Sequence, residues 1–241
     1  MAYRRTTQVQ ARLEATRDRI VDAAVRRLAT AGWAGISVAA VARDAQVATG
    51  SVYRHLDDKD ALLAAAFRRA AGRELQVVTD AASAEDAPAA RLESALRVFA
   101  DRALQGRRLA YALLAEPAGA AVEAERLTYR AGYRALFQEI LLDGIADGTV
   151  HDHDAEVVAA VLVGAMGEAV VGPVAPVDAS PRDGARLDAL VATCLRAVPF
   201  TTDVTTNATT YATTNVAADA TTNATTGVTA DVPPPEPGAT P

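Results

Sequence analysis

The sequence predicts an all-α protein. No segment alternates apolar and polar residues over a useful length, which argues against β-strands. Apolar residues instead recur three and four positions apart in nine segments of the 241-residue chain. Half of the residues are hydrophobic, which is enough to form a core. We therefore expect nine helices and no strand before the composition changes near the C-terminus.

The first predicted helix covers residues 11–31, and Gly32 ends it, as Gly often does just past a helix C-terminus. Its apolar stripe consists of Ile20, Ala23, Ala24 and Leu28. Two apolar residues in the connection, Trp33 and Ile36, are expected to pack inward. Ser37 is a predicted N-cap for a second helix that covers residues 38–45.

Two more helices follow closely. The stretch "AQVATGSVYRHL", residues 45–56, contains a turn and then a short helix with a polar face. The fourth helix, in residues 57–75, has Asp residues in its first turn, where the helix dipole favours negative charge. Its apolar stripe is Leu62, Leu63, Ala66 and Phe67.

Five further helices complete the predicted fold. The fifth begins near Pro88 and contains the stripe Leu92, Ala95, Leu96 and Phe99. The others are expected, in order, over residues 107–116, 120–146, 155–171 and 181–197. The sixth is expected to stop before Pro117 and the eighth at the pair Gly172–Pro173, since proline interrupts helices.

Charge is distributed unevenly along the chain. The formal net charge is −6, but residues 1–56 carry nine Arg against four acidic residues. A basic N-terminal segment on an acidic body indicates a polyanionic partner for that segment, and random variation in surface charge is the alternative.

Two features bear on the compartment. Cys194 is the only cysteine and no signal peptide is expected after the polar start of the chain, so we expect a cytoplasmic protein. The most apolar stretch, "VVAAVLVGAMGEAVVG", contains Glu168 and several Gly. We expect it to fall short of a membrane span, and we expect no membrane partner.

The C-terminal residues 199–241 differ from the rest of the chain. Thr-Thr pairs recur there, Pro gathers at the end, and large apolar residues are almost absent. Such a segment is unable to bury a core, and we predict a disordered tail.

The order helix, short turn, polar-faced helix is typical of a helix-turn-helix, whose second helix enters the DNA major groove. With Val52 and Leu56 facing inward, the other side chains of the short helix are hydrogen-bonding groups. Ser, Thr, Tyr and Arg bind phosphates, and Arg also pairs with guanine edges. An ordinary polar surface helix is the alternative.

Residues 19–63, "RIVDAAVRRLATAGWAGISVAAVARDAQVATGSVYRHLDDKDALL", resemble the DNA-binding domain of the TetR (TetR/AcrR) family of transcriptional regulators. The resemblance includes the aromatic residue after Gly32, the segment "GSVYRHL" and Lys59. It implies double-stranded operator DNA as a partner. The residues expected to contact DNA are Ser37, Thr49, Gly50, Ser51, Tyr53, Arg54, His55 and Lys59.

The resemblance also implies two domains before the tail: a helix-turn-helix domain over 14–74 and a helical ligand-binding and dimerisation domain over 75–198. The last two helices would form a homodimer. Small residues there are Ala159, Ala160, Gly164 and Ala165, and the apolar ones are Val161, Leu162, Leu190, Val191 and Leu195. A plain intramolecular core is the alternative for part of this set.

The chain departs from the family pattern at two places in the turn. Gln46 stands where Gly is usual, and a left-handed Gln costs about 1 kcal/mol relative to Gly. Ala48 stands where a Ser N-cap is usual, so Thr49 is a candidate cap in its place.

A ligand pocket is expected among the bulky residues of the fifth to eighth helices. The candidates are Phe99, Tyr111, Leu114, Tyr129, Tyr133, Phe137 and Met166. Tyr is the more informative type, because a buried hydroxyl needs a partner that a ligand can supply. Each candidate also has the simpler interpretation of a core residue. Glu116 is a candidate anchor for a cationic ligand or a solvated helix end.

Together these features predict a ligand-responsive DNA-binding regulator, a repressor that a small molecule releases from its operator. The alternatives are a DNA-binding scaffold that senses nothing, an activator, and an enzyme, for which no phosphate loop, nucleophile elbow or zinc-ligand spacing is present. His151 and His153 are candidate ligands for a metal ion, but a polar loop with Asp154 as an N-cap explains them equally. No cofactor and no metal are expected.

Overall fold

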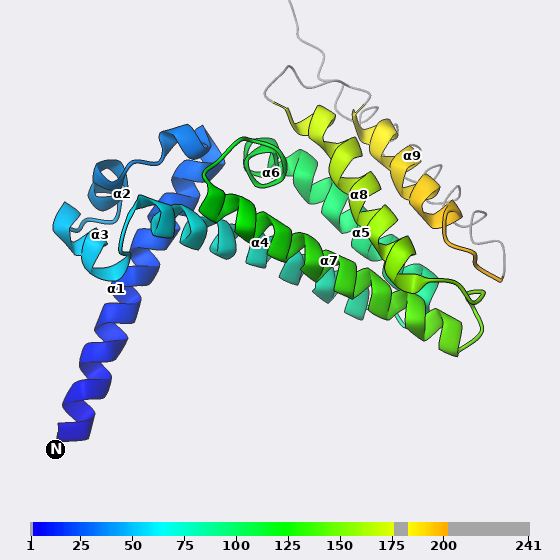
Figure 1. The fold of residues 1–241 in the computed structure, drawn as a ribbon, viewed down its shortest axis with the longest axis horizontal. Coiled ribbons are helices and arrows are strands. Elements are labelled where there is room, and N and C mark those ends of the chain that lie inside the picture. Colours follow the sequence, from blue (N-terminus) through cyan, green and yellow to red (C-terminus); the bar gives the residue numbers. More distant parts are fainter. Residues whose placement is uncertain (1, 176–182, 202–241) are drawn as a thin grey trace, which may run out of the picture. The chain divides into compact units, whose positions relative to one another are not determined.

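The computed structural model describes residues 2–175 and 183–201. Within these ranges it has nine α-helices, one 3-10 helix and no strand, as predicted (Figure 1). The described residues all belong to one compact unit. The predicted tail lies outside the described residues except for residues 199–201, where Phe200 forms an isolated β-bridge with Val150.

The helix-turn-helix part contains α1 (Ala2–Ala31), a 3-10 turn (Trp33–Gly35), α2 (Val38–Asp44) and α3 (Thr49–His55). The start of α1 was wrongly predicted at residue 11. Residues 2–10 contain neither Gly nor Pro, so the helix continues there although Val9 and Leu13 remain exposed. A prediction from apolar periodicity detects only the stretch of a helix that is buried.

The turns of this part follow the predicted chemistry at three of four positions. Gly32 has φ 66 at the end of α1, and Gln46 has φ 55 between α2 and α3. Ser37 caps α2, because its hydroxyl accepts the Ala40 N–H at 3.2 Å. The expected Thr49 cap is wrong: Ala48 is the N-cap of α3 without a side-chain bond, and Thr49 is already inside the helix.

Helix α4 (Lys59–Ser83) connects the two hydrophobic cores of the described chain. Asp58 caps it by accepting the Ala61 N–H at 2.7 Å. Its first half packs against α1, and its second half belongs to the other core with α5 and α7. The predicted domain boundary at residues 74 and 75 lies inside α4, so the two regions share one continuous helix.

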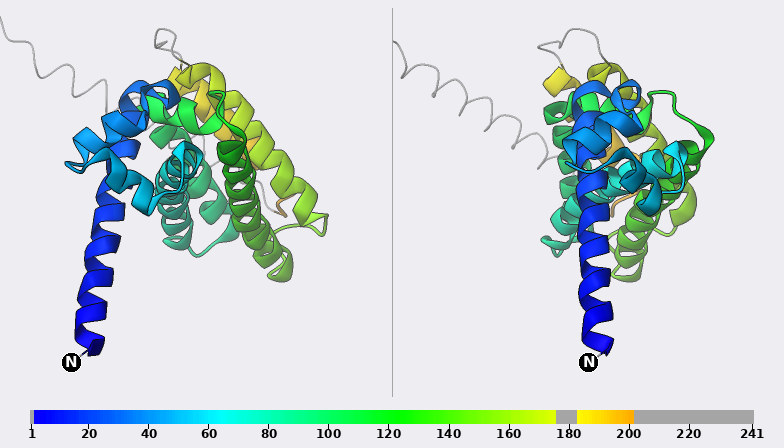
Figure 2. Two further views of the ribbon diagram at one scale, coloured as in Figure 1. Left: turned by 60° about the vertical axis from the view of Figure 1, so that its left-hand side comes forward. Right: turned by 90° about the vertical axis from the view of Figure 1, so that its left-hand side faces the viewer.

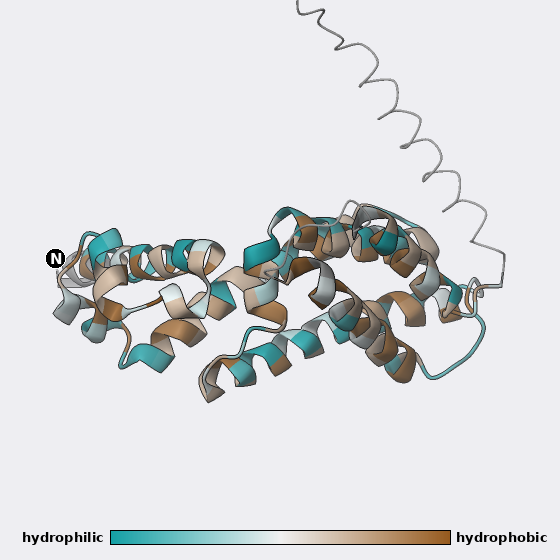
Figure 3. Cartoon of the chain, turned by 90° about the horizontal axis from the view of Figure 1, so that it is seen from above, coloured by the Kyte–Doolittle hydropathy of each residue, from teal (hydrophilic) through white to brown (hydrophobic). Residues whose placement is uncertain are grey.

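The second core is made by the later helices. They are α5 (Pro88–Gln105), α6 (Arg107–Leu114), α7 (Ala120–Ala146), α8 (Ala155–Val174) and α9 (Asp183–Arg196). Figure 2 shows α7 and α8 side by side, in agreement with their contacts. Hydrophobic and hydrophilic residues both occur along the helices (Figure 3). Helix α8 extends to Val174, past the predicted stop at Gly172–Pro173, and the Ala175 N–H still bonds the Val171 carbonyl at 3.0 Å.

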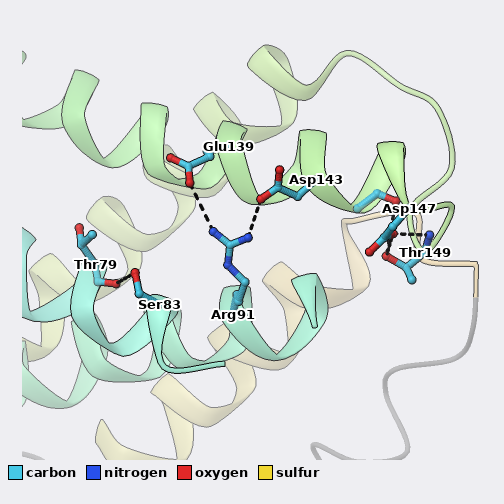
Figure 4. A network of polar contacts seen from close by, with 8 residues as sticks. Thr79, Ser83, Arg91, Glu139, Asp143, Asp147 and Thr149 are labelled. Carbon is cyan, nitrogen blue, oxygen red and sulfur yellow. Dashed lines mark hydrogen bonds and ion pairs between the residues drawn. The ribbon is translucent and has the colours of Figure 1, made fainter. Parts of the chain in front are cut away.

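Polar contacts hold the start of α5 to the end of α7. The guanidinium of Arg91 bonds Asp143 at 2.5 Å and approaches Glu139 at 3.5 Å (Figure 4). Beyond the end of α7, Asp147 accepts hydrogen bonds from the N–H and the hydroxyl of Thr149. These bonds lower the pKa of the Asp147 carboxyl below its usual range. These contacts together hold the start of α5, the end of α7 and the turn after α7 in place.

Helix α8 is long and apolar enough over Ala155–Gly172 to cross a membrane by length and composition, so the expectation for this stretch is corrected. Its glutamates are too few to offset the valines and alanines around them. Only 28% of the span is buried within the chain, and Val157 and Val161 are each 55% exposed. The helix therefore has one face in the core and one apolar face outside it.

The strained Gln46 gives the first prediction. We expect Gln46→Gly to raise the free energy of unfolding by about 1 kcal/mol, because Gly adopts a positive φ without the steric cost. Urea unfolding followed by circular dichroism measures it. The control is Gln76→Gly on the exposed face of α4, which should lower stability by about as much, since Gly is unfavourable inside a helix. Destabilisation by both substitutions would show that Gln46 is not strained.

Candidate helix-turn-helix and apolar cavity

Helix α3 presents polar groups to solvent and anchors itself through two apolar residues. Val52 and Leu56 are buried, whereas Tyr53 is 50% exposed and Arg54 is exposed. A Cβ added at Gly50 would meet no atom within 4 Å, so the backbone there is open to close approach. The outward face of this helix is therefore rich in hydrogen-bonding groups, and its backbone is open at Gly50.

The residues predicted to contact DNA lie on one continuous stretch of structure. Ser37 is the exposed N-cap of α2, and Lys59 is exposed at the first position of α4. The remaining six are all on α3, where Ser51 and His55 are only partly exposed: Thr49, Gly50, Ser51, Tyr53, Arg54 and His55.

An ion pair that the sequence did not reveal holds α2 to α1. The Arg27 Nε lies 2.7 Å from an Asp44 carboxylate oxygen, and Arg27 also donates to the Gly35 carbonyl at 3.2 Å. The Arg27 guanidinium beside Asp44 lowers the pKa of that carboxyl below its usual range. The contact fixes the end of α2 and so the place where the turn to α3 begins.

A mostly apolar cavity of about 370 Å³ lies among α4, α5, α6, α7 and α8. Its lining includes all of the predicted pocket residues except Tyr111. Tyr111 lies on α6, and it packs partly buried against the second core. Helix α6 contributes four other residues to the cavity, namely Leu109, Ala110, Leu113 and Leu114.

The two tyrosines of α7 that line the cavity differ in their hydroxyls. The Tyr129 hydroxyl donates to the Arg68 carbonyl of α4 at 2.9 Å. The Tyr133 hydroxyl has no hydrogen-bond partner among the residues that the structure describes, and its ring contacts Phe99 edge-on with centroids 5.4 Å apart. Burial raises the pKa of Tyr133 well above its usual value, so this hydroxyl keeps its proton.

Charged residues, which apolar periodicity does not indicate as pocket candidates, also line the cavity. Glu74 accepts two hydrogen bonds from Arg102, at 2.5 and 2.8 Å. Arg126 and Arg130 come from α7. The signal was available, because Arg126, Tyr133 and Phe137 lie on one face at helical spacing.

The C-terminal end of α6 is bonded both to the cavity wall and to the helix-turn-helix part. Arg126 donates to the carbonyls of Leu113 at 2.8 Å and of Glu116 at 3.0 Å. On the other side, the indole N–H of Trp33 donates to the Ala112 carbonyl at 3.0 Å, and the Trp33 backbone N–H donates to Glu116 at 3.3 Å. Carbonyls that the helix leaves unpaired thus find partners in two separate regions.

Glu116 is therefore a structural residue rather than a solvated helix end. Its carboxylate also accepts a bond from Arg108 at 2.8 Å, and its side chain is 18% exposed. The Arg108 guanidinium rests against Gly32, where an added Cβ would lie 1.5 Å from it. Gly32 is needed both for its positive φ and for this close contact.

The histidine loop before α8 has the structural role that was one of its two interpretations. Asp154 caps α8 by accepting the Val157 N–H at 3.1 Å, and His153 contacts the His151 carbonyl at 2.8 Å. No group of three or more His, Cys, Asp or Glu arranged to hold a metal occurs among the described residues.

Comparison with known families decides the classification. The family model described as "Bacterial regulatory proteins, tetR family" matches residues 20–66, which contain α2 and α3. A second, "Tetracyclin repressor-like, C-terminal domain", matches residues 85–170. The chain belongs to the TetR family. Both matched regions agree with the helix-turn-helix and the cavity described above, so the predicted family is confirmed.

Among curated proteins, this TetR-family chain is similar to the HTH-type transcriptional regulator BetI of Burkholderia thailandensis, with 40% identity over 83 residues. BetI of Burkholderia mallei matches equally. The alignment covers 34% of this chain and 42% of those proteins, so it spans less than half of their length.

Solved structures share the fold at low identity. A TetR regulator of Haloarcula marismortui matches with a TM-score of 0.64 and 24% identity over 76% of this chain and 96% of that one. FadR of Bacillus subtilis in complex with stearoyl-CoA has a TM-score of 0.59 and 21% identity over 72% and 96%. RolR in complex with resorcinol has a TM-score of 0.61 and 20% identity over 83% and 93%.

The exposed face of α3 predicts the effect of removing its long side chains. We expect Arg54→Ala and Tyr53→Ala each to weaken binding to a duplex selected by the protein. Loss of a good base contact costs about 1–3 kcal/mol, and loss of a phosphate contact also lowers the salt slope by about one. Gel-shift titration at two salt concentrations measures both effects, with the exposed α7 residue Arg134→Ala as control. Unchanged affinity in both α3 variants would refute the recognition-helix assignment.

Gly50 gives a prediction with opposite signs for stability and binding. We expect Gly50→Ala to raise the free energy of unfolding by about 0.5–1 kcal/mol, because Ala is favoured over Gly within a helix and the site has room for it. The same methyl group should weaken DNA binding if the backbone approaches the duplex there. Thermal melting and gel-shift titration on one preparation separate the two effects, and a variant that gains stability without losing affinity argues against close approach.

Proposed function

We propose that the chain is a ligand-responsive transcriptional repressor that a small molecule releases from operator DNA. The observation that carries this proposal is the apolar cavity whose wall, at the end of α6, is hydrogen-bonded to Trp33 beside the helix-turn-helix. A protein that only bound DNA would have no need of such a cavity, so the cavity disfavours a scaffold that senses nothing.

In the proposed DNA complex, α3 lies in the major groove with Tyr53 and Arg54 toward the duplex. Thr49, Ser51 and His55 would contact phosphates or base edges beside them. The exposed N-cap Ser37 and Lys59 would contact the backbone on either side of the recognition helix. The excess of arginine in residues 1–56 supports a polyanionic partner for this part of the chain.

The route from ligand to DNA runs through α6. A ligand in the cavity would contact Leu113 and Arg126, and both belong to the region where α6 ends. A shift of this end changes the positions of Ala112 and Glu116, which bond Trp33. Release requires that ligand bind the DNA-incompetent state more tightly, and the coupling is then reciprocal.

We further propose a homodimer through α8 and α9. Part of the predicted set belongs to the core instead, since Ala159, Leu162, Val191 and Leu195 are buried within the chain. The opposite face of α8 presents Val157, Ala160 and Val161 to solvent. A dimer formed through this face must place its two recognition helices about one DNA turn, ~34 Å, apart to bind successive half-sites.

The family comparison supports the class of function. The matching C-terminal model is tetracyclin repressor-like, and two fold neighbours were solved with a small molecule, stearoyl-CoA or resorcinol. The curated relatives are transcriptional regulators, and this supports a non-enzymatic role at the level of the family. We propose a cytoplasmic location and no catalytic activity, cofactor or resident metal for this chain.

The proposed function is tested with the full chain and a duplex that it selects from a random DNA library. A screen of small apolar and aromatic metabolites for thermal shift supplies candidate effectors. We expect compounds that raise the melting temperature to release the duplex, since binding to one state shifts the equilibrium toward it. Compounds that bind without changing DNA affinity contradict ligand responsiveness, and absence of sequence-selective binding contradicts the DNA-binding role.

The α6 contacts predict a variant that binds both partners but couples them poorly. We expect Glu116→Gln to keep DNA affinity within about threefold, while the effector that releases the wild-type complex becomes about fivefold less effective. The reason is that the neutral side chain loses its ionic bond to Arg108 and holds Trp33 less firmly. Fluorescence anisotropy of labelled duplex against effector concentration measures it.

Glu85→Gln, in the exposed loop before α5, is the matched control for loss of one negative charge. Equal responses of the wild-type chain and both variants would show that the Trp33–Glu116 contact does not carry the signal.

A further inference from the structure

The cavity wall has an unbalanced charge. Glu74 is bonded twice to Arg102, and Arg126 is bonded to Glu123 and to carbonyls at the end of α6. Arg130 has neither an ion pair nor a hydrogen bond with any residue that the structure describes. The described wall therefore provides one positive charge that the protein itself does not neutralise.

Arg130 lies at the rim rather than deep in the cavity. The residue is exposed, and its Nη2 is 3.8 Å from the place that a Cβ on Gly167 of α8 would occupy. Gly167 also lines the cavity, so the guanidinium extends from α7 across the wall toward α8. Because Gly167 has no side chain, the donors of Arg130 keep access to a group at the cavity mouth.

Tyr133 lies one helical turn from Arg130 and supplies the second free polar group. Its hydroxyl is without a hydrogen-bond partner among the described residues, whereas the Tyr129 hydroxyl is already used on α4. Between them and the opposite wall, the surface is made by Phe99, Phe137 and Met166. An apolar body with one acceptor-rich end fits this arrangement of groups.

We propose that the cavity binds an amphipathic monoanion, an aliphatic or aryl-alkyl carboxylate whose carboxylate pairs with Arg130 and accepts a hydrogen bond from Tyr133. The apolar body of the ligand fills the space among α5, α7 and α8. This inference rests on the proposed function for one point only, that the cavity is the effector site. Burial holds the proton on Tyr133, and this suits it as a donor to a carboxylate.

The geometry favours this class over three others. A cationic amine would meet an unpaired guanidinium, which repels it. A neutral amide or phenol would forgo the charge-assisted bond, which is about twice as strong as a neutral one. A coenzyme A thioester carries several phosphate charges, for which the described rim offers a single free guanidinium. A cavity of 370 Å³ is also at the small end for ligand sites, about 300–1,000 Å³.

The binding experiment uses the full chain and matched probes on the same carbon skeleton. These are octanoate, octanamide, octylamine and octanoyl-CoA, with hydrocinnamate and its amide as the aromatic pair. Calorimetry gives the dissociation constants, and Trp33 fluorescence reports independently, because this single tryptophan stacks on the cavity residue Phe67 with centroids 6.3 Å apart. We expect a carboxylate to bind about tenfold tighter than its amide, and the amine most weakly.

Two variants and a control assign the preference to residues. Arg130→Gln should reduce carboxylate binding to the level of the amide and leave amide binding unchanged. Tyr133→Phe should weaken carboxylate binding about threefold to tenfold while the preference over amide remains. Arg134→Gln removes the same charge from an exposed site on α7 that does not line the cavity, and should behave as wild type.

Each outcome bears on the proposal. Equal binding of carboxylate and amide by the wild-type chain, tighter binding of octanoyl-CoA than of octanoate, or no binding of any carboxylate overturns it. A preference that survives Arg130→Gln overturns it as well. Carboxylate binding that leaves affinity for the selected duplex unchanged supports the ligand class but contradicts the proposed function. Release of the duplex by a neutral compound, without preference for carboxylates, supports the proposed function but contradicts the proposed ligand class.

Discussion

The hydrogen bonds at the C-terminal end of α6 are the contact on which the arrangement of this protein depends. A helix end leaves carbonyls without partners, and burying them unpaired would cost free energy. Here the Trp33 indole satisfies one of them from the side of the helix-turn-helix, and Arg126 satisfies others from the cavity wall. Because both regions donate hydrogen bonds to carbonyls at the same end of α6, neither region moves relative to α6 without losing some of these bonds.

Helix α4 provides the second connection and behaves differently. It is continuous from the exposed Lys59 to the cavity residues Glu74 and Val78, and it packs in both hydrophobic cores. In the first of these cores its Phe67 stacks on Trp33 of the 3-10 turn, and Phe67 also lines the cavity. Apolar packing of this kind is tight but tolerates small sliding, whereas the α6 bonds are directional. The same two regions are thus connected twice, by apolar packing along α4 that tolerates small shifts and by directional hydrogen bonds at the end of α6.

The sequence predicted what local chemistry determines. Ser37 and Asp154 cap the helices that they precede, and Gln46 adopts the left-handed turn that its place in the motif requires. It did not predict what depends on partners distant along the chain. Glu116 was assigned to solvent or a ligand because its acceptor role involves Trp33, 83 positions away. Tyr111 and the cavity residue Leu114 are both apolar-face candidates on α6, and only packing distinguishes which one faces the cavity.

The charged residues of the cavity follow the same division. Periodicity selects apolar and aromatic residues for a core, so arginines at the same helical spacing are assigned to the surface. In the folded chain Arg102 and Arg126 are retained at the wall because each has carboxylate partners, and their cost of desolvation is thereby offset. Arg130 has no such partner and lies at the exposed rim, where hydration stabilises its charge. A charge in that position adds little to folding, and its electrostatic attraction is left for whatever enters the cavity.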